Sequence, residues 1–140
     1  MRIVAFASTT PALLGGAKTV TRRDWDPAYA ARFRAGDLVA AWDRSPRAGG
    51  RKVATIRLTD APILQDPFDA PEGDWEREGF AWMSVRGLLC GNVPPEAVWV
   101  AWKHAPSQPL WVVRFALVSV EPPAPPTVAA HPQIGLADIP

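Results

Sequence analysis

The sequence predicts an α+β fold: a small mixed, mostly antiparallel β-barrel, closed or nearly closed, with short flanking helices. Two observations favour this class. Short apolar segments of strand character alternate with segments long enough for only a few helical turns, which suits a barrel better than a doubly wound sheet. The chain has 140 residues and no internal repeats, a length that fits one domain with a single modest core.

The first elements are a strand and a very short helix. Residues 2–6 are apolar enough for a buried strand. Thr10-Pro11 is typical of a helix N-cap and first helical position, and Gly15-Gly16 ends the helix after little more than one turn. We expect this helix to deliver Lys18 to the surface.

A second short helix and a hairpin follow. Asp26-Pro27 repeats the cap-and-proline signal, and Gly36 ends the helix. Residues 38–42 and 52–59 are strand candidates. The proline and glycines between them predict a flexible hairpin loop over residues 44–50.

The second half contains one clear helix and the best strand of the sequence. Residues 60–74 are proline-rich and lack a sustained period, so we expect a long irregular connection, and residues 75–85 are ambiguous. Pro94-Pro95-Glu96 opens a helix. Residues 110–120, rich in Val, Trp and Phe, should form a strand through the centre of the sheet.

The composition changes after residue 120, where prolines become frequent. This predicts a domain over residues 1–120 and a proline-rich C-terminal tail over residues 121–140. We expect Val128, Ile134 and Leu136 of the tail to pack on the domain or on a second copy of the chain. The sequence leaves the oligomeric state open.

The net charge of +1 hides an asymmetry between the two halves. Residues 1–57 hold 11 Lys and Arg against 4 Asp and Glu, whereas residues 58–140 hold 4 against 10. The two halves could neutralise each other across the fold. Alternatively, basic residues could share one face and attract phosphates; the candidates are Arg22, Arg23, Arg44, Arg47, Arg51 and Lys52.

Several classes of protein have little support. No apolar stretch approaches the roughly 18 residues of a membrane span, and the N-terminal apolar run is too short for a signal peptide, so we expect a cytoplasmic protein without a membrane partner. The single cysteine, Cys90, cannot form an internal disulfide, and we expect a buried, inert thiol. No metal-ligand spacing, phosphate-loop glycine pattern or Ser/His/Asp arrangement is present, so we expect no metal or cofactor.

The most informative stretch is Lys18-Thr19-Val20-Thr21-Arg22-Arg23, which places three cations and two hydroxyls directly after a helix end. Cations held close together lower the pKa of the lysine, and the hydroxyls can donate to phosphate or carbonyl oxygens. The cluster therefore suits an anionic or carbonyl-bearing ligand. In an ideal strand Lys18 and Thr21 would point to opposite faces, so their cooperation requires irregular geometry near Val20.

The cluster and its neighbour supply the candidate ligand-binding residues Thr19, Arg22, Arg23 and Trp25. Trp25 directly follows the basic run, and its ring could stack on a nucleobase, although core packing is equally open for it. We expect core packing for Trp99, Trp102 and Trp111. The threonines could instead serve β-propensity, and Arg23 could pair with Asp37.

The N-terminal strand, the short helix, the Lys18-Thr19-x-Thr21-x-Arg23 run and Phe33-x-x-Gly36-Asp37-x-Val39 together resemble the ASCH domains of the PUA-like superfamily. The resemblance covers about the first 60 residues and extends more weakly through Glu78-Gly79-Phe80 and the last strand. It implies a small β-barrel that handles RNA or nucleosides.

One group of ASCH-like proteins consists of N4-acetylcytidine amidohydrolases. The resemblance of this chain to that group implies the catalytic residues Lys18, Thr21 and Glu78. Lys18 would take the proton of Thr21, Thr21 would attack the amide carbonyl, and Glu78 would protonate the departing amine. Other acids lie close to Glu78 in the sequence, so the choice of carboxylate stays open among Glu72, Asp74, Glu76 and Glu78.

Three functions remain. The first, which the family resemblance favours, is a module that binds RNA or a modified nucleoside in a basic cleft, and the second is a small hydrolase of N4-acylated cytidines or of RNA. The third is a protein-interaction domain whose proline-rich tail recruits a partner. A cleft in which Lys18, Thr21 and an acid of residues 72–78 meet within hydrogen-bond reach would favour the hydrolase. A cleft with cations and an aromatic wall but no acid would favour binding.

Overall fold

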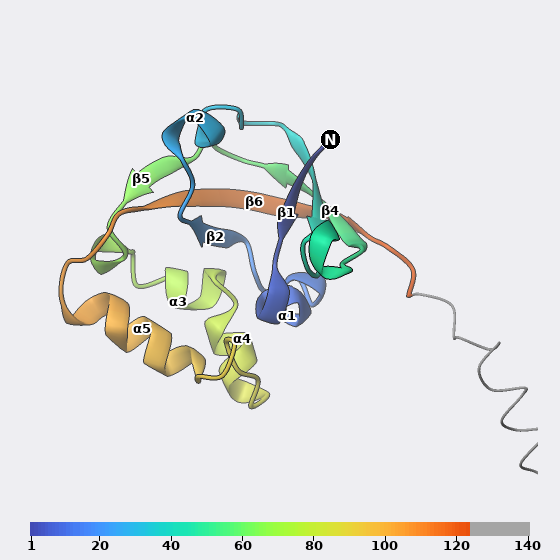
Figure 1. Ribbon diagram of the computed structural model, residues 1–140. Coiled ribbons are helices and arrows are strands. Elements are labelled where there is room, and N and C mark those ends of the chain that lie inside the picture. Colours follow the sequence, from blue (N-terminus) through green and yellow to red (C-terminus); the bar gives the residue numbers. More distant parts are fainter. Residues whose placement is uncertain (124–140) are drawn as a thin grey trace, which may run out of the picture.

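The computed structural model describes residues 1–123 and has a curled, mostly antiparallel sheet with short helices around it (Figure 1). The predicted α+β fold class is confirmed. The strands are β1 (Arg2–Ala5), β2 (Val20–Arg23), β3 (Leu38–Trp42), β4 (Lys52–Leu58), β5 (Ile63–Gln65) and β6 (Leu110–Val120). The α-helices are α1 (Thr10–Leu14), α2 (Pro27–Ala30), α3 (Asp74–Arg77), α4 (Phe80–Val85) and α5 (Pro95–His104). Short 3-10 turns cover Ala7–Thr9, Pro46–Ala48 and Pro67–Asp69.

The sheet is a half-barrel with strand order β1-β3-β4-β6-β2, and β5 also pairs with β6. The β1–β3 pair is parallel and the other pairs are antiparallel. Within residues 1–123, β1 and β2 end the hydrogen-bonded path and do not pair with each other. The barrel is therefore open between these two strands.

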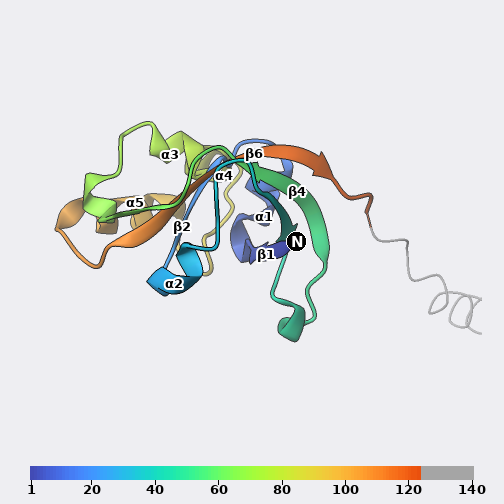
Figure 2. The same ribbon diagram turned by 90° about the horizontal axis from the view of Figure 1, so that it is seen from above.

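Strand β6 is the central strand, as its composition predicts. Residues 111–114 pair with β2 on one side, and residues 110–112 pair with β5 on the other. Residues 115–120 pair with β4, where a register irregularity between Thr55 and Ile56 accompanies the curvature. This long strand spans the whole molecule in Figure 1, and Figure 2 shows β4 and β6 curving together.

The core fills the concave side of the sheet. Its members are apolar side chains that are at least nine-tenths buried: Val4, Phe6, Leu13, Phe33, Val39, Ala41, Val53, Ala54, Ile56, Leu58, Val113 and Phe115. The short helix α1 contributes Leu13, which is fully buried. Together with Ala12, which is also fully buried, it anchors a helix that is too short to be stable alone.

The end of α1 determines where Lys18 lies. The Ala12 carbonyl accepts hydrogen bonds from the N–H groups of Ala17 and Lys18, and Gly16 adopts φ +78° to allow the turn. The turn directs the chain inward, so Lys18 is only 2% exposed. The expectation of a surface lysine is wrong, because the helix ends against α4 and not against solvent.

Residues 60–85 are more regular than the sequence predicts. Three residues of the expected long connection form β5, which pairs with Leu110, Trp111 and Val112. The ambiguous segment that follows contains α3 and α4, which meet at Gly79. Helices α3, α4 and α5 gather below β2 and β6 in Figure 1.

An aromatic cluster joins these three helices. Trp75 lies 6.0 Å from Trp99, and Phe80 lies 5.5 Å from Trp102, between ring centroids. Trp99, Trp102 and Trp111 are half-buried and are not members of the core cluster, so the expected core packing of these three side chains is not found. No helix within the described part of the chain is long and apolar enough to cross a membrane. The expected packing of Val128, Ile134 and Leu136 lies outside the described residues.

Candidate functional site

A cleft of about 270 Å³ lies where the half-barrel is open, between the end of β1 and strand β2. Its walls come from both ends of the sheet and from the helices below. The lining residues are Ala5, Phe6, Ala7, Thr9, Lys18, Thr21, Arg22, Arg23, Glu78, Phe80, Cys90, Val98 and Trp102. The cleft thus holds three cations, one carboxylate, two threonine hydroxyls, one thiol and several aromatic rings.

Lys18 and Glu78 form a buried pair at this cleft. The Lys18 Nζ donates to Glu78 Oε1 at 2.8 Å and to the Glu78 backbone oxygen at 3.0 Å. Burial lowers the pKa of Lys18, and nearby Arg23 lowers it further, whereas the charge of Glu78 opposes the shift. Of these causes, the neighbouring cation is the one that the sequence predicts, whereas burial, the largest cause, follows from the fold.

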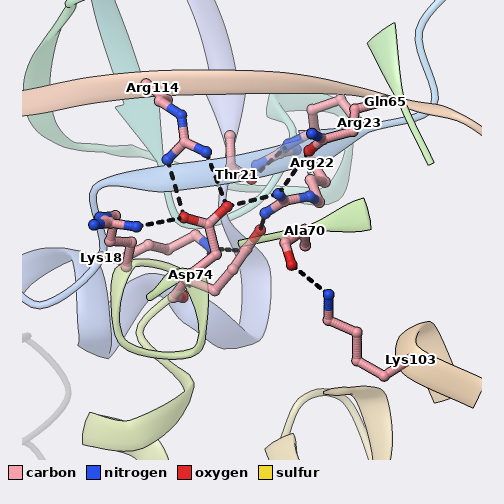
Figure 3. A network of polar contacts seen from close by, with 11 residues as sticks. Lys18, Thr21, Arg22, Arg23, Gln65, Ala70, Asp74, Lys103 and Arg114 are labelled. Carbon is pink, nitrogen blue, oxygen red and sulfur yellow. Dashed lines mark hydrogen bonds and ion pairs between the residues drawn. The ribbon is translucent and has the colours of Figure 1, made fainter. Parts of the chain in front are cut away.

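Arg22 holds the other side of the same carboxylate. Its Nη1 donates to Glu78 Oε2 at 2.6 Å, and its Nη2 donates to Asp74 Oδ2 at 2.6 Å (Figure 3). The Nη2 also reaches Gln65 Oε1 at 3.3 Å. Because cations hold both oxygens of Glu78, its carboxylate has one orientation.

Thr21 and Arg23 lie together on β2. The Arg23 Nε donates to Thr21 Oγ1 at 3.0 Å, and the guanidinium lies 5.2 Å from the centroid of the Phe6 ring. Within residues 1–123, Arg23 forms no ion pair with a carboxylate. The alternative pairing with Asp37 is not formed, since that carboxylate accepts from the Arg34 N–H. The remaining N–H donors of Arg23 are available to a ligand.

The four candidate acids separate into three environments. Glu78 lines the cleft, whereas Asp74 is fully buried among arginines. Glu72 and Glu76 line a different cavity of about 590 Å³, together with Gly73, Trp75, Glu96, Trp99 and Val100. Of the four, Glu78 alone contacts Lys18.

Two candidate ligand-binding residues do not line the cleft. The Thr19 backbone N–H donates to the Arg77 carbonyl, and its own carbonyl accepts from Phe115, so this residue joins β2 to its neighbours. The Trp25 ring stacks on Phe33 with centroids 4.6 Å apart and packs against the core. Ligand contact by Thr19 or Trp25 stays a prediction.

The four other candidate cations, Arg44, Arg47, Arg51 and Lys52, are not among the lining residues of the cleft. They belong to the β3–β4 hairpin, whose end projects from the rest of the sheet in Figure 2. Lys52 lies 3.9 Å from Glu121 in an exposed pair. The cleft and the hairpin are therefore separate basic regions.

Sequence reasoning missed several cleft residues. Cys90 is half-buried and not fully buried as expected, although burial raises the pKa of its thiol, which disfavours the reactive thiolate. Phe6 and Trp102 reach the cleft from distant elements, and their sequence positions give no sign of it.

The sequence does give a sign of one partner of Asp74, since Arg114 is the single charged residue of strand β6. Within residues 1–123, no group of three or more His, Cys, Asp and Glu side chains is arranged to hold a metal ion.

Comparison with known proteins yields one informative likeness. No family model matches the chain, and no curated protein matches it. Among solved structures, the chain is similar to protein EF3133 from Enterococcus faecalis V583, of family DUF984, at a TM-score of 0.54 and 14% identity. The likeness covers 89% of this chain and 84% of that protein. At this identity it shows the fold alone, a curled sheet that is compatible with a PUA-like barrel.

Proposed function

We propose that this protein is a small hydrolase of the ASCH type, which cleaves the amide of N4-acylated cytidines with Lys18, Thr21 and Glu78. One observation carries the proposal: the buried Lys18–Glu78 pair lines the same cleft as the Thr21 hydroxyl. This combination of amine, acid and hydroxyl is the one that distinguishes a hydrolase from a purely basic binding cleft. The resemblance of the Lys18-Thr19-x-Thr21-x-Arg23 run supplies the substrate class.

Lys18 is the proposed base. A lowered pKa increases the neutral fraction of the amine near neutral pH, and a neutral amine has two N–H donors and one lone pair. The Glu78 carboxylate and carbonyl oxygens accept the two donors, so the lone pair stays free. Among residues 1–123 no hydrogen bond joins Lys18 to Thr21, whose Oγ1 accepts from Arg23, so the mechanism requires the Lys18 amine to approach the Thr21 hydroxyl when the substrate binds. The Thr21 oxygen then forms a bond to the amide carbonyl carbon.

The proton passes from Lys18 through Glu78 to the departing amino group, and the C–N bond breaks to release cytidine. Water then hydrolyses the ester on Thr21, which returns the hydroxyl and releases the carboxylic acid. Arg23 assists both steps, because its hydrogen bond to Thr21 Oγ1 stabilises negative charge on that oxygen. Its other N–H groups are available to the carbonyl oxygen of the substrate.

The size of the cleft supports a small substrate. About 270 Å³ is slightly below the roughly 300 Å³ at which the range for small-molecule pockets begins. The cations of the β3–β4 hairpin do not extend the cleft into a track for a phosphate backbone. A nucleoside therefore suits this cleft better than an RNA strand.

A second candidate function is binding of a modified nucleoside without turnover. The specific observation in its favour is Arg23, whose guanidinium faces the cleft without a carboxylate partner among residues 1–123. Phe6, Phe80 and Trp102 supply aromatic surface beside it. Such a cleft could hold a base and its acyl group through stacking and hydrogen bonds.

The test is a turnover assay with N4-acetylcytidine, in which chromatography measures cytidine and acetate. We expect Lys18→Ala and Thr21→Ala each to lower kcat by about a hundredfold or more, because each removes a reacting group. Thr59→Ala is the matched control, since it removes the hydroxyl of an exposed threonine that does not line the cleft. It should keep most of the activity.

The outcomes separate the candidate functions. Equal turnover in the wild type, Lys18→Ala and Thr21→Ala would exclude the assigned mechanism. Binding of N4-acetylcytidine without turnover would favour the nucleoside-binding module. Cleavage of short single-stranded RNA, with N4-acetylcytidine untouched, would replace the proposed substrate.

A further inference from the structure

Asp74 is the most completely enclosed charged group in the described part of the chain. Its side chain is 0% exposed, yet its carboxylate accepts hydrogen bonds from three arginines. The Arg22 Nη2 lies 2.6 Å from Oδ2, both Arg114 nitrogens lie 3.0 Å from the carboxylate oxygens, and the Arg77 Nη1 lies 3.1 Å from Oδ1. These bonds hold the pKa of Asp74 at about 2 despite its burial.

The Asp74 carboxylate connects to the cleft through a single side chain. Arg22 donates one terminal nitrogen to Asp74 and the other to Glu78, and Glu78 in turn accepts from Lys18. Figure 3 shows Asp74 between Arg114 and Arg22 on the side of the network away from Lys103. Asp74 itself does not line the cleft. It acts on the cleft only through Arg22.

The contacts of Arg22 with Asp74 and Glu78 restrict the orientation of its guanidinium and balance its charge. A guanidinium with two opposite carboxylates has little freedom to rotate, so Asp74 fixes the direction in which Arg22 meets Glu78. The negative charge of Asp74 also offsets the positive charge of Arg22 close to Lys18. Arg77 and Arg114 approach Asp74 from the outside, and their side chains are 51% and 29% exposed.

We propose that Asp74 is a positioning residue of the cleft. It orients the Arg22 guanidinium toward Glu78 and thereby holds the Glu78 carboxylate against Lys18. The positive charge of Arg114 partly neutralises the Asp74 carboxylate, so it determines how strongly Asp74 offsets the charge of Arg22. Only the turnover measurements used to test this proposal depend on the proposed hydrolase function. The geometry and the charge balance at Lys18 can be tested without a substrate.

Charge changes in this network should move the titration of Lys18 in opposite directions. Asp74→Asn removes the negative charge beside Arg22, so the uncompensated guanidinium should lower the pKa of Lys18 further. Arg114→Gln removes a positive charge, so it should raise the pKa of Lys18. The groups that face Lys18 directly, Glu78, Arg23 and Cys90, are unchanged in both variants.

The pH dependence of catalysis should shift in the same directions as the pKa of Lys18. The mechanism needs neutral Lys18, so the rising limb of the kcat/KM profile against pH should move to lower pH in Asp74→Asn and to higher pH in Arg114→Gln. The loss of this orientation in Asp74→Asn should also lower kcat by about ten- to hundredfold, the size seen when a hydrogen bond that orients a metal ligand is lost. The double variant should bring the limb back toward that of the wild type.

The experiment combines this pH profile, with N4-acetylcytidine as substrate, and a titration of the Lys18 amine by NMR of isotope-labelled lysine. Arg77→Gln is the matched control, because Arg77 contacts the same carboxylate from solvent through one nitrogen. It should shift both readouts less than Arg114→Gln does. Circular dichroism checks that each variant is folded.

Opposite shifts of the Lys18 titration in Asp74→Asn and Arg114→Gln support the proposal. Shifts in the same direction, or no shift in either, overturn it. If Asp74→Asn does not fold, Arg114→Gln against Arg77→Gln decides, and equal titrations in those two variants overturn the proposal. Absence of turnover in the wild type contradicts the proposed function but leaves the titration, and hence this inference, testable.

Discussion

Lys18 shows how a single residue can depart from its usual behaviour. Lysine is rarely buried without a partner, and here the partner is the carboxylate of Glu78, which sits 60 positions later in the chain. Burial favours the neutral amine and the ion pair favours the charged one. The net direction is a lowered pKa, since desolvation is the largest cause.

This lowered pKa predicts a pH dependence of stability. The folded protein releases the Lys18 proton at lower pH than the unfolded chain, whose lysine has a pKa of 10.5. Between those two pKa values the unfolded chain binds more protons, so the free energy of unfolding contributed by Lys18 rises with pH. Below the folded pKa this contribution is constant and unfavourable.

Denaturant unfolding of the wild type and of Lys18→Met, from about pH 7 to about 10.5, measures the effect. Methionine has a similar length and does not titrate. The stability of the wild type relative to Lys18→Met should increase with pH, while titrating groups that do not interact with Lys18 cancel. A difference that falls with pH would mean that the ion pair with Glu78 outweighs burial.

At the scale of elements, the junction of α3 and α4 places Glu78 at the cleft. Gly79 follows Glu78 directly, with φ +87° and no space for a side chain. A Cβ atom there would lie 2.6 Å from the Ala12 Cβ and 3.3 Å from the Lys18 Cβ. The tight approach lets α4 pack against α1, so Lys18 and Glu78 meet at this contact.

Gly79→Ala should therefore be unusually costly. The left-handed conformation alone costs about 1–2 kcal/mol for alanine, and overpacking adds about 1–3 kcal/mol. Gly87→Ala is the matched control, because Gly87 also has positive φ, +66°, but nothing lies within 4 Å of the point that an alanine Cβ would occupy. Thermal or denaturant unfolding compares the two. Equal destabilisation would show that the contact with α1 relaxes easily.

At the scale of the whole molecule, the basic and acidic halves of the sequence meet across the fold. Lys18 pairs with Glu78, Arg22 with Asp74 and Glu78, and Lys52 with Glu121, and each pair joins residues 1–57 to residues 58–140. Mutual neutralisation therefore explains part of the charge asymmetry. The hairpin cations outside these pairs are not part of the cleft.

This separation predicts that the hairpin does not serve the cleft. The double variant Arg44→Gln, Arg47→Gln should keep the kcat/KM for N4-acetylcytidine within about twofold of the wild type, because exposed charges beyond about 10 Å are screened at 0.1 M salt. Turnover should also change little between about 50 and 200 mM salt. A steep loss with salt, or a loss of about tenfold in the double variant, would instead indicate a phosphate-binding surface that includes the hairpin.

The sequence by itself determined most elements of the first half and the central strand. Asp26 caps α2 with its own side chain, and residues 38–42 and 110–120 form the strands that their apolar composition predicts. These features depend on local capping, turn chemistry and β-propensity, which neighbouring residues specify. The resemblance also selected Lys18, Thr21 and Glu78, which the fold brings to one cleft.

Only the tertiary structure decided what depends on distant partners. Strand β5 forms because residues 110–112 of β6 supply its hydrogen-bond partners. Lys18 is buried because α4 packs over the end of α1. The separation of Glu78 from Glu72, Asp74 and Glu76 likewise depends on which elements α3 meets. Burial and ion pairing are properties of neighbours in space, and one sequence does not state which residues those neighbours are.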